Sequence, residues 1–109
     1  MSIEFTDNDF DDDLNIINTE QHISLIIGYS DQCHRCRELI NNIDNDNRSI
    51  IYGKIDLKKN EDFAQFVAMK YNLNTLNVPL ITLFKDRKFV KKIPNKFPLS
   101  HILMEIRNL

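Results

Sequence analysis

The sequence predicts an α/β fold in which a central mixed sheet of five strands is flanked by four helices. Two observations carry this prediction. Short apolar runs alternate with segments whose apolar residues recur every three or four positions, which indicates strands alternating with helices. Two late strands, expected at 80–84 and 88–93, are joined only by Lys85-Asp86-Arg87, so they must form an antiparallel hairpin. At 109 residues, the chain is expected to be a single domain over 1–109.

The first part of the chain is expected to hold a short strand and the first helix. Residues 3–5 form the extended start, and Thr6 or Asp7 can cap the helix that follows. Acidic residues crowd its first turns, where carboxylates are stabilised by the positive end of the helix macrodipole. The apolar positions of this helix, spaced i, i+4 and i+7, are Phe10, Leu14 and Ile17.

The middle of the chain contains the most apolar segment, followed directly by a helical stripe. Residues 22–29 form a near-continuous apolar run that suits a central strand covered on both faces. The next helix ends in the polar stretch 44–48, and its inward face consists of Cys36, Leu39, Ile40 and Ile43.

The second half repeats this alternation before the hairpin. A strand at 50–55 precedes a helix that Asn60 can cap, with an inward face of Phe63, Phe66, Val67 and Tyr71. After the hairpin, a last helix begins near Pro98 or Ser100, and its apolar positions are Leu99, Ile102, Leu103 and Ile106.

Composition favours a globular chain, with 42% hydrophobic and 28% charged residues. The net charge of -2 gives no reason to expect nucleic acid as a partner. No apolar run is long enough to cross a membrane, and the first residues show neither the basic nor the apolar region of a secretory signal. We therefore expect a cytoplasmic, reducing location and no membrane partner.

Charge is unevenly distributed along the chain. Acidic residues crowd the start, and basic residues crowd a later segment, namely Lys85, Arg87, Lys88, Lys91, Lys92 and Lys96. We interpret both groups mainly as solvated faces, because lysines along an edge strand discourage pairing with other sheets. A patch that docks a partner is the alternative interpretation.

A lone Cys-x-x-Cys in a cytosolic chain of this pattern indicates redox chemistry. Cys33 falls where a buried strand ends and a helix begins, so unpaired N–H groups and the macrodipole favour negative charge there. The pKa of the Cys33 thiol is therefore expected below its ordinary value of about 8.5. Cys36 lies one turn later on the apolar stripe, within reach of a disulfide. We infer that Cys33 attacks a substrate disulfide and that Cys36 resolves the mixed disulfide.

His34 and Arg35 stand between the two cysteines. Both add positive charge that favours the Cys33 thiolate, which stabilises the reduced form and makes the disulfide more oxidising. The alternative is that both side chains point into solvent and contribute little.

Together, the element order, the Cys-x-x-Cys at a strand–helix junction and Val78-Pro79 at the hairpin resemble the thioredoxin family over essentially the whole chain. The resemblance implies that Pro79 is a cis proline beside the dithiol and that the main chain of Val78 pairs with the substrate peptide. It implies that Lys54 lies behind the site, where it can tune a thiol pKa, and that Gln32 contacts substrate. The expected activity is reduction of protein disulfides by a monomer without a cofactor, with electrons supplied by a disulfide reductase.

The site departs from the family's usual Trp-Cys-Gly-Pro-Cys. The chain has Gln32-Cys33-His34-Arg35-Cys36 and no tryptophan, and Ile27 stands where the family carries a buried aspartate that accepts a proton from the resolving thiol. The resemblance therefore leaves proton transfer, docking to a reductase and substrate choice open.

Other functions remain as alternatives. The basic pair His34-Arg35 suits a glutaredoxin-like or oxidising variant, and a thioredoxin-like adaptor would need no dithiol chemistry at all. A structural zinc site usually needs four ligands, and the chain has a single cysteine pair, so no metal is expected. Replacing both cysteines by serine separates the enzyme from the adaptor.

Overall fold

One mixed sheet forms the centre of the computed structural model, which describes residues 2–46 and 50–109. The strands stand in the order β1-β3-β2-β4-β5, where β1–β3 and β3–β2 are parallel and β2–β4 and β4–β5 are antiparallel. Their bounds are Ile3–Phe5 for β1, Ile23–Tyr29 for β2, Ile51–Asp56 for β3, Leu80–Lys85 for β4 and Lys88–Ile93 for β5. The predicted five-stranded sheet and its hairpin are confirmed, with β5 at an edge.

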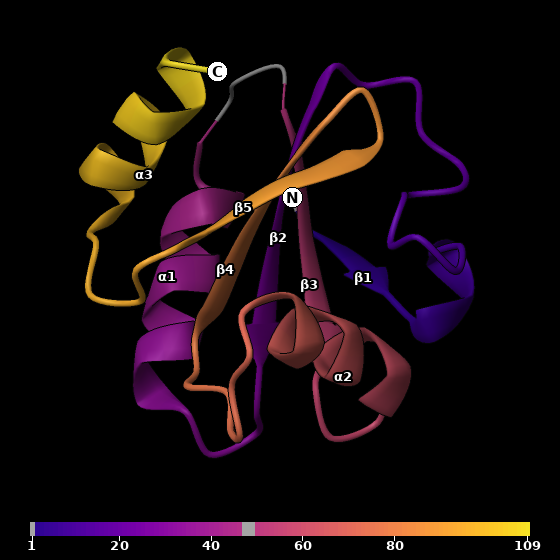
Figure 1. Cartoon of the computed structure of the whole chain (residues 1–109). Coiled ribbons are helices and arrows are strands. Elements are labelled where there is room, and N and C mark those ends of the chain that lie inside the picture. The colour runs from indigo at the N-terminus through magenta and orange to yellow at the C-terminus, as the bar shows by residue number, and fades with distance from the viewer. Residues whose placement is uncertain (1, 47–49) are drawn as a thin grey trace.

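Three α-helices cover this sheet within the described residues: α1 (His34–Asp44), α2 (Glu61–Lys70) and α3 (Leu99–Arg107). Figure 1 shows α1 and α3 on one face of the sheet and α2 on the other. None of these helices is long and apolar enough to span a membrane. The polar stretch predicted to end the second helix begins at the end of α1, although its residues 47 and 48 lie outside the described part of the chain.

The sheet separates two apolar cores, because successive side chains of a strand point to opposite faces. In β2, Leu25 and Ile27 face α1 and α3, whereas Ile26 faces α2, and all three are fully buried. From the helices, Leu39 and Ile102 join the first core. β2 is therefore the central strand covered on both faces that its apolar run predicted.

The prediction of an α-helix after Thr6 is wrong. The described residues form three α-helices where four were expected. Only Asp7–Asp9 are helical, in a single 3-10 turn. Thr6 does cap this turn, since its side-chain oxygen accepts the N–H of Asn8 at 3.3 Å. The acidic residues that suggested the first turn of a long helix thus belong to a turn of three residues.

The side chain of Asp11 explains why the helix does not continue. Its carboxylate accepts the N–H groups of Asp13 and Asn15, both at 2.9 Å, so the main chain turns instead of coiling. Leu14 then adopts a φ of 64°, in the left-handed region that no right-handed helix contains. Leu14 is nevertheless fully buried as predicted, whereas Ile17 is 42% exposed.

The amino end of α2 is capped by a residue from far away in the sequence. Asn60 occupies the N-cap position, as predicted, but its side chain makes no capping bond. The Asp7 carboxylate instead accepts the N–H groups of Phe63 at 2.8 Å and Asp62 at 3.3 Å. The Asn60 amide accepts the Asp7 N–H at 2.9 Å and donates to the Asp56 carbonyl at 2.8 Å. These four bonds fix the N-terminal segment to α2 and β3.

Candidate dithiol site

The two cysteines form a disulfide at the amino end of α1, with 5.3 Å between their Cα atoms. Cys33 is the N-cap residue, and its Sγ accepts the N–H of Cys36 at 3.1 Å. Cys33 is half-buried and its neighbour Gln32 is exposed, whereas Cys36 is only 1% exposed. The strand-to-helix junction therefore presents one sulfur toward solvent and keeps the other inside.

The basic pair between the cysteines contacts partners outside the dithiol. His34 Nε2 lies 3.2 Å from a carboxylate oxygen of Glu38, one turn along α1. The Arg35 guanidinium donates to the main-chain carbonyl of Asn95 at 2.8 Å. Both side chains are exposed, but neither is simply solvated. Sequence reasoning did not find Asn95, because no local pattern links it to Arg35.

Pro79 lies at the end of the sheet from which the dithiol helix starts. Gly28 of β2 pairs with Leu80 of β4, so the residue before Leu80 stands beside the end of β2 that leads to Cys33. The Val78–Pro79 peptide bond is cis, Pro79 is buried and Val78 is half-buried. Figure 1 shows the beginnings of α1 and β4 at the same end of the sheet. The structure thus brings Pro79 and the cysteine pair to one region.

Lys54 lies on the sheet face behind this site. It is a half-buried residue of β3, in register with Ile27 of β2 and Glu4 of β1. Residues in register on neighbouring strands point to the same face, and Ile27 points into the core beneath α1 and α3. Lys54 is therefore directed toward that face, where Ile27 is a fully buried apolar side chain.

Tyr29 ends β2 just before the dithiol and carries a polar contact that sequence reasoning missed. Its hydroxyl donates to the Glu4 carboxylate, with distances of 3.1 and 3.0 Å to the two oxygens. Its ring packs against the α1–α3 core. Burial, followed by the hydrogen bond to Glu4, raises the pKa of Tyr29 to about 12. The signal that could have indicated such a contact is an aromatic hydroxyl at the end of a buried strand.

Comparison with known proteins identifies the fold. No protein-family model matches the chain, and no curated protein matches it in sequence. Solved structures do match in shape. Thioredoxin f2 of Chlamydomonas reinhardtii has a TM-score of 0.70 at 12% identity, over 99% of this chain and 95% of that one. The N21Q mutant thioredoxin from Halobacterium salinarum NRC-1 has a TM-score of 0.66 at 21% identity, over 82% and 75%.

Fasciola hepatica thioredoxin gives a TM-score of 0.61 at 17% identity, over 82% of this chain and 83% of that one. The chain therefore has the thioredoxin fold, as its sequence predicted. It carries a Cys-x-x-Cys disulfide at the amino end of α1. This combination of fold and pair supports thiol–disulfide oxidoreduction as the general class of activity.

Proposed function

We propose that the chain is a thioredoxin-family oxidoreductase that reduces protein disulfides, with Cys33 as the nucleophile and Cys36 as the resolving thiol. The observation that carries this proposal is the unequal placement of the pair. Cys33 caps α1 and is half-buried, whereas Cys36 is 1% exposed. The exchange reaction needs this asymmetry, because one sulfur must meet the substrate and the other must reach only the first sulfur.

The surroundings of Cys33 Sγ favour its reactive form. The N–H of Cys36 points at this sulfur from 3.1 Å, and the positive end of the α1 macrodipole lies at the same place. Both interactions stabilise negative charge, and the thiolate is the form that attacks disulfides. The geometry thus supports Cys33, and not Cys36, as the attacking residue.

The proposed reaction transfers two electrons from the dithiol to the substrate. The Cys33 thiolate attacks one substrate sulfur, so a mixed disulfide forms while the substrate S–S bond breaks and its other sulfur leaves as a thiolate, protonated by water. Cys36 then loses its proton to water and attacks Cys33 Sγ. This step releases the second substrate sulfur as a thiolate, which water also protonates. The Cys33–Cys36 disulfide of the structure is the oxidised product of this sequence.

Residues around the pair receive supporting roles in the proposal. Pro79, Val78 and Gln32 position the substrate chain, and Lys54 acts on the thiol pKa from behind the site. Arg35 is assigned mainly to holding the Asn95 segment, since its guanidinium is committed to that carbonyl. We further propose a monomer in a reducing cytoplasm that receives electrons from a disulfide reductase.

Trapping of mixed disulfides tests the proposal. The reduced Cys36→Ser variant, incubated with an oxidised disulfide-containing protein, should accumulate a covalent adduct visible by non-reducing electrophoresis and intact mass. The reduced Cys33→Ser variant is the matched control and should form none. Adducts in both variants would overturn the role assignment, and adducts in neither, together with no turnover by the native chain, would leave an adaptor as the better function.

The reduction potential decides the direction of electron flow. Equilibration of the pair with dithiothreitol and glutathione buffers should give a reduction potential of about -270 mV, as for reducing thioredoxins. A potential of about -200 mV or higher would place the chain with the glutaredoxin-like or oxidising alternatives. Such a value would overturn the reducing direction while leaving the dithiol chemistry intact.

A further inference from the structure

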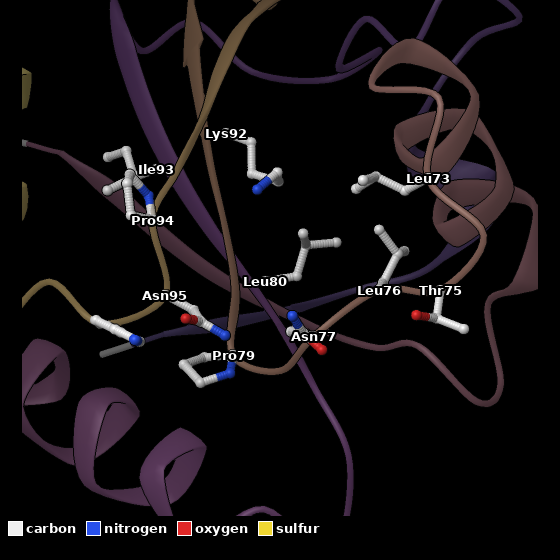
Figure 2. A pocket seen from close by; sticks show the side chains of 11 residues that line it. Leu73, Thr75, Leu76, Asn77, Pro79, Leu80, Lys92, Ile93, Pro94 and Asn95 are labelled. Atoms are coloured by element: carbon white, nitrogen blue, oxygen red, sulfur yellow. The ribbon is translucent and has the colours of Figure 1, made fainter.

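A groove of about 310 Å³ lies beside Pro79 (Figure 2). One wall comes from the loop before β4, and its exposed apolar member is Leu73, at 40% exposure. The opposite wall comes from the end of β5 and the segment after it, residues 92–96. Leu80 at the start of β4 also lines the groove. The groove is thus both partly apolar and adjacent to the end of the sheet that carries the dithiol.

The charge of this groove is one-sided. Lys92 and Lys96 line it, and no Asp or Glu stands among the described residues of its lining. Arg35, which donates to the Asn95 carbonyl of the same wall, adds a third cation at its border. The remaining polar lining, which includes Asn77, carries no charge. A concave surface of this kind attracts negative charge.

Lys92 differs from its neighbour Lys91 in a way that leaves it available to a ligand. Side chains alternate along β5, and Lys91 turns to the α3 side, where its Nζ lies 2.8 Å from a Glu105 oxygen. Lys92 is directed into the groove, between Ile93 and Leu73 in Figure 2. Its charge has no such carboxylate on the groove side, within the described lining.

Two contacts with Tyr71 restrain Lys92 before any ligand binds. Its main-chain N–H donates to the Tyr71 hydroxyl at 2.7 Å, and its Nζ lies 5.5 Å from the centre of the Tyr71 ring. A half-buried lysine held in this manner loses less side-chain freedom on binding than a free surface lysine. Lys92 is therefore suited to select ligands and not only to attract them.

We propose that this groove receives an acidic segment of the protein substrate, with Lys92 and Lys96 as specificity-determining residues. A carboxylate of the segment accepts charge-assisted hydrogen bonds from the lysines, and an adjacent apolar side chain packs on Leu73 and the apolar part of the lining. The inference rests on the proposed function, because it names the substrate class of the same site. It commits to a peptide, since the apolar walls have no use in binding a simple anion.

Peptide binding to the oxidised native chain tests the inference without any redox step. Three short, cysteine-free peptides are compared, each with one Leu and with Glu, Gln or Lys at the same three positions. Titrations followed by amide NMR should shift the signals of Lys92, Asn95 and Asn77, with the Glu peptide binding about tenfold more tightly than the Gln peptide. Raising NaCl from about 0.05 M to about 0.5 M should remove most of this preference.

Matched variants test which lysines produce the preference for the Glu peptide. Lys92→Gln combined with Lys96→Gln should reduce the Glu-to-Gln ratio of affinities to about one, and Lys92→Glu should turn the preference toward the Lys peptide. Lys88→Gln, an exposed lysine at the other end of β5, should keep the ratio. A native ratio near one, or a ratio that survives the double substitution, would overturn the proposal.

Two further measurements distinguish this inference from a simple anion site and from the proposed function. Inorganic phosphate at equal ionic strength should bind more weakly than the Glu peptide, and equal binding would replace the peptide site by a simple anion site. Reduction of an uncharged small disulfide by the native chain tests the dithiol chemistry alone. Reduction without any peptide preference would mean that the acidic-segment inference fails and the proposed function stands, whereas preference without reduction would mean the reverse.

Discussion

The Arg35 guanidinium and the main-chain carbonyl of Asn95 are joined by a hydrogen bond of 2.8 Å across 60 positions of sequence. Arg35 stands in the first turn of α1, between the cysteines, and Asn95 belongs to the segment that links β5 to α3. The bond therefore ties the dithiol motif to one wall of the groove. We therefore expect Arg35 to act as a positioning residue for that wall.

Arg35→Gln is expected to loosen this wall with little effect on the reduction potential. The Phe97 N–H, which donates to the Pro94 carbonyl at 3.1 Å, should exchange its hydrogen several-fold faster because the segment loses its tether. Loss of one exposed bond should cost about 1 kcal/mol or less of unfolding free energy. Arg37→Gln, exposed on the same helix, is the control. If hydrogen exchange at Phe97 is unchanged and the reduction potential of the dithiol shifts, Arg35 acts on the dithiol through its charge alone.

Tyr29→Phe is expected to make the free energy of unfolding less sensitive to high pH. Burial and Glu4 raise the pKa of Tyr29 from 10.0 to about 12, so the folded chain holds this proton more tightly than the unfolded chain. The resulting stability is fully present below pH 10 and is lost as pH rises toward 12. Urea unfolding at pH 9 and pH 11.5 should show a smaller decline for the variant than for the native chain. In an absorbance titration, the tyrosinate signal that the native chain shows and the variant lacks should have a midpoint near pH 12. A midpoint near pH 10 would contradict the buried contact.

Asp7→Ala is expected to destabilise the fold by about 1–2 kcal/mol. The Asp7 carboxylate accepts the N–H groups of Phe63 and Asp62, and no other side chain caps α2 in the described residues. Chemical denaturation measures the loss. Asp12→Ala, in the same acidic run but exposed, should change stability by less than about 0.5 kcal/mol. Equal effects of the two substitutions would point to general charge and not to capping.

Ile27→Asp is expected to cost about 3 kcal/mol or more at neutral pH, because it places a carboxylate in a fully buried apolar position. Ile27→Asn is the uncharged control. Burial raises the pKa of the introduced carboxyl, so the Asp variant should lose stability relative to the Asn variant as pH rises through that pKa.

The double variant with Lys54→Met should be less stable than Ile27→Asp alone, because Lys54 stands in register with position 27 on the same face. No coupling between the two positions would show that Lys54 does not sense charge there. If the folded Ile27→Asp variant resolves mixed disulfides faster than the native chain, the absence of a proton acceptor at position 27 limits the native reaction.

The sheet and the dithiol junction could be predicted because local residues determine them. The apolar run of β2 and the stripe through Cys36 depend only on the side chains of their own segments, and both were confirmed. The N-terminal helix could not be excluded from periodicity, because the Asp11 carboxylate, through its bonds to Asp13 and Asn15, decides the backbone there.

Contacts between distant segments could not be predicted from the sequence for a different reason. Asp7 caps α2 and Arg35 binds Asn95 only because the sheet topology brings these segments together. Lys92 was interpreted as one more edge lysine, and the neighbouring Lys91–Glu105 pair shows how strand alternation gives adjacent lysines different surroundings. The residue roles assigned at the dithiol stay predictions until the variants are measured.

The strand order has a consequence for how the site comes into being. Cys33 and Pro79 approach each other only when Gly28 pairs with Leu80, and α1, β3 and α2 lie in sequence between these two strands. Closing so long a loop costs entropy before any contact compensates for it, whereas the β4–β5 hairpin can form locally. In a refolding time course, peptide binding should therefore recover together with the complete sheet and never ahead of it.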